Sequence, residues 1–186
     1  MNIIQNIVEV TDRPKAITIG NFDGIHKGHQ SLIKTTSNIA IENGLESLGF
    51  TFSKLPEEVF DIEDFSRLND NNLKSSYIEK FNIDTILSID FNEIKEYSAE
   101  FFCEQILIKK LNTKYLVIGH NFKFGKNREG DINKLKEYHD KGHFELITPE
   151  LEQYDNKNIS STRIRSLLKE GKLSEAKECL GKNYEL

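Results

Sequence analysis

The sequence has 186 residues, of which 37% are hydrophobic and 30% charged, and its formal net charge at pH 7 is −5. This length suits one domain with a sizeable core, and the hydrophobic share excludes a disordered chain. The acidic balance disfavours a general nucleic-acid binder. The first ten residues lack the features of a secretory signal, and no apolar run reaches membrane-spanning length, so we expect a cytoplasmic protein that contacts no membrane.

Short apolar runs alternate with helical patterns as far as Pro149, which indicates a single α/β domain over residues 1–186. The helical patterns are long enough for crossovers that make neighbouring strands parallel. Beyond Pro149 we expect a C-terminal tail of helices only, and we expect the acidic stretch 57–64 to be a solvated loop. The five predicted strands are 16–19, 45–52, 85–89, 115–118 and 144–147, and the predicted helices are 28–43, 71–81, 99–111, 132–141, 161–169 and 174–180.

A turn rich in glycine, with two histidines, follows the first predicted strand. Gly20 and Gly24 let the backbone turn close to a ligand, and Gly28 keeps the first helical turn open between His26 and His29. The unpaired N–H groups and positive dipole end of a helix start attract phosphate oxygens. Because ligands of open parallel sheets bind beyond the carboxyl ends of the strands, we expect a nucleotide phosphate at this turn.

Two further polar clusters fall at strand ends or helix starts. Residues 119–125 follow the fourth predicted strand, and residues 159–165 open the first helix of the tail. Hydroxyl groups and forked guanidinium groups in the second cluster suit a polyphosphate. All three clusters could converge on one crevice. The side chains concerned in the second cluster are those of Ser160, Ser161, Thr162, Arg163 and Arg165.

These motifs, in order and rough separation, resemble the three signatures of the bacterial FAD synthetase family in its FMN adenylyltransferase module. They read Gly20-x-Phe-Asp-Gly-x-His-x-Gly-His29, Gly119-x-Asn-Phe-x-Phe-Gly125 with Gly130-Asp131, and Ile159-Ser-Ser-Thr-Arg-Ile-Arg165. The resemblance implies a Rossmann-like nucleotidylyltransferase fold and direct in-line attack of the FMN phosphate on the α-phosphorus of ATP. FAD and pyrophosphate are the implied products, with Mg²⁺ assisting.

The resemblance also implies roles for individual residues. His26, His29 and Arg165 are the implied catalytic residues, which contact the ATP phosphates and stabilise the transition state. Asn121 is in addition a candidate Mg²⁺ ligand. The implied nucleotide-binding residues are Gly20, Asn21, Phe22, Asp23, Gly24, Gly119, Asn121, Ser160, Ser161, Thr162 and Arg163, and the candidates for the flavin side are Phe52, Pro56, Phe124, Arg128 and Asp131.

The sequence departs from the family pattern in two places. Many relatives continue into a riboflavin kinase module, whereas here Tyr184 is followed by two residues. We therefore expect a chain that lacks riboflavin kinase activity, takes ready-made FMN and works beside a separate riboflavin kinase without a stable partner. In addition, Leu55 stands where the family usually has a histidine beside the flavin, which bears on flavin affinity.

Other functions and roles remain open on the residues alone. The acceptor of the adenylyl group could be a phosphopantetheine, a nicotinamide compound or a phosphoalcohol, or the chain could bind nucleotide or flavin without turnover. His26 and His29 could share a metal ion, but no third His or Cys has ligand spacing, which disfavours zinc. Asp131 could be an ordinary helix cap.

Overall fold

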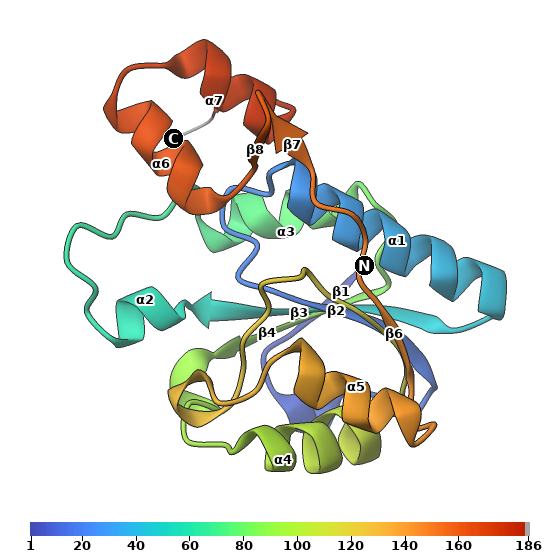
Figure 1. The fold of residues 1–186 in the computed structure, drawn as a ribbon. Helices are drawn as coiled ribbons and strands as arrows, with labels where there is room; N and C mark the ends of the chain where they lie inside the picture. The colour runs from blue at the N-terminus through green and yellow to red at the C-terminus, as the bar shows by residue number, and fades with distance from the viewer. Residues whose placement is uncertain (185–186) are drawn as a thin grey trace.

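The computed structural model describes residues 1–184, and its centre is a six-stranded parallel sheet (Figure 1). The strand order is β1-β4-β3-β2-β5-β6. After β1 at one edge, the chain enters the middle of the sheet at β2, adds β3 and β4 toward β1, and then adds β5 and β6 toward the other edge. The strands are β1 (Asn2–Ile4), β2 (Lys15–Ile19), β3 (Glu46–Lys54), β4 (Thr85–Asp90), β5 (Thr113–Val117) and β6 (Glu145–Ile147).

Helices cover both faces of this sheet. In Figure 1, α1 and α3 lie on one face and α4 and α5 on the other, while α6 and α7 stand apart above the first pair. The helices are α1 (Lys27–Asn43), α2 (Pro56–Val59), α3 (Asn71–Glu79), α4 (Ala99–Phe101), α5 (Ile132–Asp140), α6 (Ser161–Lys169) and α7 (Leu173–Leu180). The α4 helix continues as the π-helix η3 (Phe102–Lys110). Within residues 1–184 no helix is both long and apolar enough to cross a membrane.

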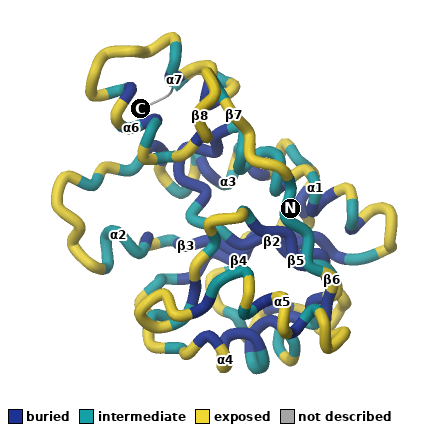
Figure 2. The backbone as a smooth tube through the Cα atoms, viewed as in Figure 1, coloured by how far each residue is buried: buried dark blue, intermediate teal, exposed yellow. Residues whose placement is uncertain are grey.

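The hydrophobic core has one cluster that includes Phe102 and Leu135 from the α4–α5 side of the sheet and another that includes Ile33 and Ile78 from the α1–α3 side. The central strands between them are buried (Figure 2). All five residues of β2 are buried, which is expected of an inner parallel strand covered on both sides. The tail helices form a smaller cluster of their own, in which Leu68 packs with Ile164 and Leu180. The tail is thus held against the loop that precedes α3.

The predicted α/β architecture and all five predicted strands are confirmed, with three corrections. The sheet has a sixth strand, because Asn2–Ile4 pairs with β4 at the sheet edge although it is too short to show a periodic pattern. The tail is not helical throughout, since β7 (Gln153–Tyr154) and β8 (Lys157–Asn158) form an antiparallel hairpin. The acidic loop contains α2, whose first residue is a proline that suits a helix start.

Candidate active site

The site is built on the turn that leads from β2 into α1. The Gly24 N–H donates to the Asn69 side chain, and Gly24 has a φ of +84°. A Cβ at Gly24 would lie 2.8 Å from Leu68 Cδ1, so glycine is required there. Phe22 and Ile25 also have positive φ, of 49° and 44°, and both are fully buried. Such strain in a bulky and a β-branched residue persists where the surrounding packing enforces it, which is a feature of functional sites.

The two histidines stack at the start of α1. Their ring centroids lie 3.6 Å apart, and His26 Nδ1 accepts a hydrogen bond of 3.3 Å from the His29 backbone N–H. Since Nδ1 accepts, a neutral His26 carries its proton on Nε2. Burial lowers the pKa of His26 to about 4, and burial, with the proximity of His26 and Lys74, lowers the pKa of His29 well below its ordinary value. Both imidazoles are therefore neutral at pH 7.

Asp23 connects this turn to the C-terminal tail. Its carboxylate forms an ion pair with Arg165 and accepts a 2.9 Å hydrogen bond from the Leu68 N–H. Its backbone carbonyl accepts a 2.8 Å hydrogen bond from the Ser161 hydroxyl. Arg165 also donates to the Ser66 carbonyl at 2.7 Å. The first and third motifs thus meet through direct contacts between residues more than 130 positions apart.

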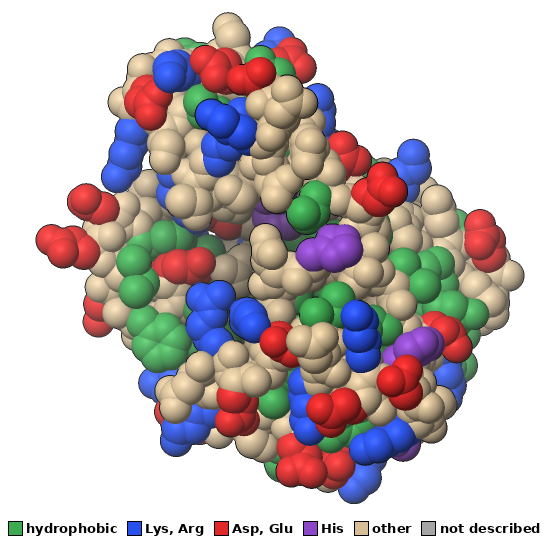
Figure 3. Space-filling model, viewed as in Figure 1, with side chains coloured by type: hydrophobic (Ala, Val, Ile, Leu, Met, Phe, Trp, Pro, Cys, Tyr) green, Lys and Arg blue, Asp and Glu red, His purple; other side chains and the backbone are tan. Residues whose placement is uncertain are grey.

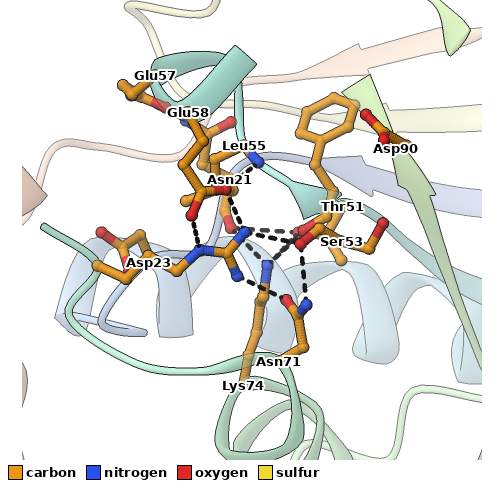
Figure 4. A network of polar contacts seen from close by, with 12 residues as sticks. Asn21, Asp23, Thr51, Ser53, Leu55, Glu57, Glu58, Asn71, Lys74 and Asp90 are labelled. Atoms are coloured by element: carbon orange, nitrogen blue, oxygen red, sulfur yellow. Dashed lines mark hydrogen bonds and ion pairs between the residues drawn. The ribbon is translucent and has the colours of Figure 1, made fainter. Parts of the chain in front are cut away.

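A polar network joins the turn to the carboxyl end of β3 (Figure 4). The Asn21 amide donates to both carboxylate oxygens of Glu57, at 3.2 and 3.1 Å. The backbone carbonyl of Asn21 accepts from the Thr51 hydroxyl at 3.2 Å and from Lys74 Nζ at 3.3 Å. Lys74 Nζ also donates to the Phe52 carbonyl at 2.8 Å.

Arg67 holds the segment after β3 in place. It forms a two-pronged ion pair with Glu58 and donates to the Ser53 carbonyl at 2.7 Å and to the Asn71 side chain at 3.0 Å. The hydrogen bond from Arg67 lowers the pKa of Glu58. Glu58 in turn accepts a 2.7 Å hydrogen bond from the Leu55 N–H at the start of α2. The loop between β3 and α3 is therefore fixed by charge-assisted hydrogen bonds.

One face of the molecule is hollowed near the C-terminal helices (Figure 3). Figure 3 shows a hollow between the C-terminal helical segment and the sheet, with histidine and basic side chains at its border. The neutral imidazoles of His26 and His29 at the start of α1, with the Arg165 guanidinium nearby on Asp23, lie at the carboxyl-end edge of the parallel sheet, where N–H donors favour an anionic guest. The arrangement can bind phosphate groups and stabilise negative charge that develops on them.

Comparison with known proteins identifies the family. Residues 8–163 match the model of the FAD synthetase family. The chain belongs to that family. It is 38% identical over 186 residues to the bifunctional riboflavin kinase/FMN adenylyltransferase of Buchnera aphidicola subsp. Schizaphis graminum, a match that covers 98% of this chain and 59% of that relative. The protein of the same name from Listeria monocytogenes is 32% identical over 182 residues, with 95% and 56% covered. This FAD synthetase family member thus spans less than two thirds of the length of these relatives.

Solved structures share the fold. A crystal structure described as a macrolide-efflux protein from Streptococcus pneumoniae has a TM-score of 0.81 and 27% identity, over 98% of this chain and 70% of that one. Pantothenate synthetase from Thermus thermophilus has a TM-score of 0.57 at 13% identity, over 97% and 82%, which is a likeness of fold alone. The Rossmann-like nucleotidylyltransferase fold that the FAD synthetase motifs imply is confirmed.

Most nucleotide-side candidates of the FAD synthetase motifs lie at one edge of the sheet, whereas the Arg163 side chain contacts the β7–β8 hairpin. Gly119 and Asn121 follow β5, which neighbours β2, so they lie at the same edge of the sheet as the histidine turn. Ser160 accepts from the Arg163 N–H and is the N-cap of α6. The Arg163 guanidinium, however, donates to two carbonyls of the β7–β8 hairpin and lies over the Tyr154 ring. Arg163 thus supports the hairpin.

The flavin-side candidates of the FAD synthetase motifs fall into two groups. Phe52 and Pro56 lie at the end of β3 and the start of α2, beside the Asn21 network, and Leu55 between them is buried in the core. Phe124 is buried and its ring packs against those of Phe102 and Phe122. Arg128 is exposed, and Asp131 caps α5 while pairing with Lys123 at 3.0 Å. The capping interpretation of Asp131 is confirmed.

The sequence motifs did not reveal several polar residues of the site. Asn69, Arg67 and Glu57 reach it from loops or from a short helix, where no periodic pattern marks them. Lys74 carries a weak signal, because it shares a helical face with buried Ile78 at a position where an apolar residue is expected.

Proposed function

We propose that this chain transfers AMP from ATP to FMN, giving FAD and pyrophosphate. The observation that supports it best is the meeting of the His26–His29 pair, the Asp23–Arg165 ion pair and Ser161 at one edge of the sheet. Family membership supports the same reaction. The substrate on the flavin side is FMN rather than riboflavin, since the matched motifs are those of adenylyl transfer.

In the proposed step an oxygen of the FMN phosphate attacks the α-phosphorus of ATP. A new P–O bond forms, the bond between the α-phosphorus and its bridging oxygen breaks, and pyrophosphate leaves with that electron pair. No protein group needs to form a covalent bond, so positioning and charge stabilisation account for the catalysis. His26 and His29 act as neutral N–H donors, and Arg165, whose Nε and one amino group are held by Ser66 and Asp23, offers its remaining N–H donors to the leaving pyrophosphate.

A magnesium ion would enter this site with ATP. Within residues 1–184 no three His, Cys, Asp or Glu side chains are arranged to hold a metal ion. Nucleotide-bound Mg²⁺ takes most of its ligands from phosphates and water, so it needs few oxygens from the protein. The exposed side-chain oxygen of Asn121 would supply a protein ligand. When bound, the ion would neutralise charge on the leaving pyrophosphate.

The test is FAD formation by the purified chain from FMN, ATP and Mg²⁺, with chromatographic separation of the flavins. We expect FAD from FMN, none from riboflavin, and a loss of about 10²-fold or more in the His29→Ala variant. If no FAD forms while ATP still raises the melting temperature, the flavin assignment is wrong and other phosphorylated acceptors should be tried.

A further inference from the structure

Lys74 is a buried lysine that the proposed reaction does not yet use. It lies on α3, is 2% exposed, and donates to the Phe52 carbonyl at 2.8 Å and to the Thr51 hydroxyl and Asn21 carbonyl at 3.3 Å each. Within residues 1–184 no carboxylate forms an ion pair with it. Burial lowers the pKa of Lys74 to about 8, with Arg67 lowering it further and Asp23 and Glu58 opposing the shift.

The three oxygens belong to two parts of the site. The Asn21 carbonyl lies on the turn that leads to the histidines, whereas Thr51 and Phe52 form the carboxyl end of β3 (Figure 4). The end of β3 continues into Pro56, so it carries the proposed flavin side. A single ammonium group thus connects the nucleotide side to the flavin side.

Lys74 differs in its partners and its position from Lys15, the other buried lysine among the described residues. Lys15 is 0% exposed and donates to two backbone carbonyls at 2.6 Å, but it also lies 3.6 Å from the Glu46 carboxylate. It stands at the first residue of β2, at the opposite end of the sheet from the site. Burying an ammonium group without a carboxylate partner costs free energy, and an apolar side chain of the same size would stabilise the fold more.

We propose that Lys74 is a positioning residue, which holds the histidine turn and the end of β3 at the separation that in-line attack of the FMN phosphate on ATP requires. This role rests on the proposed function. Displacement of reacting groups by about 1 Å can cost about 10²-fold in rate, so one link between the two sides has a large effect on kcat. The positive charge of Lys74 also lowers the pKa of His29 and so helps to keep its imidazole neutral.

The test compares FAD formation by the wild-type protein with that of Lys74→Met and of Lys15→Met, with thermal unfolding to establish the folded fraction of each. We expect kcat per folded molecule to fall about 10-fold or more in Lys74→Met and to be unchanged in Lys15→Met, which should lose only stability. Wild-type kcat/KM for FMN should also fall above about pH 8, as Lys74 loses its proton, and this fall should be absent from Lys74→Met.

A second variant covers the case in which Lys74→Met does not fold. Thr51→Val keeps the lysine but removes one of its acceptors and the Thr51–Asn21 hydrogen bond, so kcat should fall about 3-fold with the fold retained. Wild-type kcat in folded Lys74→Met would overturn the inference. So would unchanged kcat in Thr51→Val together with a flat wild-type profile above pH 8. A wild-type protein that forms no FAD would instead refute the proposed function, and this role with it.

Discussion

Replacement of Asp23 by asparagine tests whether the turn and the tail are held together by charge. The Asp23 side chain is 3% exposed and that of Arg165 is 15% exposed, so neither charge is well solvated. Removing one partner of a buried ion pair costs about 3–5 kcal/mol, since the other charge is left without its partner. Arg165 keeps its bond to the Ser66 carbonyl, and the amide can still accept from the Leu68 N–H, so we expect about 3 kcal/mol of destabilisation.

Urea unfolding measures this cost directly. With a slope of about 2 kcal/mol per molar urea, the midpoint of Asp23→Asn should fall by about 1.5 M. The matched control is Glu137→Gln, which breaks an exposed ion pair with Lys134 and should leave the midpoint unchanged. We also expect kcat for FAD formation to fall about 10-fold or more, because Arg165 loses its fixed direction. A wild-type midpoint in Asp23→Asn would refute the claim that this pair anchors the tail to the turn.

Three further changes have expected outcomes. Gly24→Ala should destabilise the protein by about 1–3 kcal/mol in thermal unfolding, because φ is +84° and Leu68 occupies the space, whereas Gly44→Ala has open space and should cost less. The folded-state pKa of His26 is about 4 and lies below its unfolded value, so the unfolded chain binds more protons between pH 6.5 and 4. As the pH falls through that window, the free energy of unfolding should decrease by about 3 kcal/mol, and His26→Gln should reduce this loss. Burial raises the pKa of Cys103 to about 12, so its thiol should react with a disulfide reagent at pH 8 only after unfolding, and rapid reaction of the native protein would contradict this burial.

Features with a local cause could be predicted from the sequence. The helix at 161–169 was predicted with its observed bounds, since Ser160 caps its start and Gly171 follows its end with a φ of +72°. The strand, turn and helix of the histidine motif were predicted for the same reason, because apolar residues, glycines and a capping side chain act on their neighbours in sequence. The order of the motifs, which resembles that of FAD synthetases, predicted the family, and the match over residues 8–163 confirms it.

Only the tertiary structure decided which of these residues meet, and which other residues join them. Asp23 and Arg165 are 142 positions apart, and Lys74 reaches Asn21 across 53, so no periodic pattern contains either contact. The β1 strand depends on pairing with β4, and the Arg163 guanidinium donates to carbonyls of the β7–β8 hairpin, which no local pattern predicts. The physical reason is that burial and hydrogen-bond satisfaction are properties of the assembled chain, whereas helix caps, turns and strand patterns depend on residues that are adjacent in sequence.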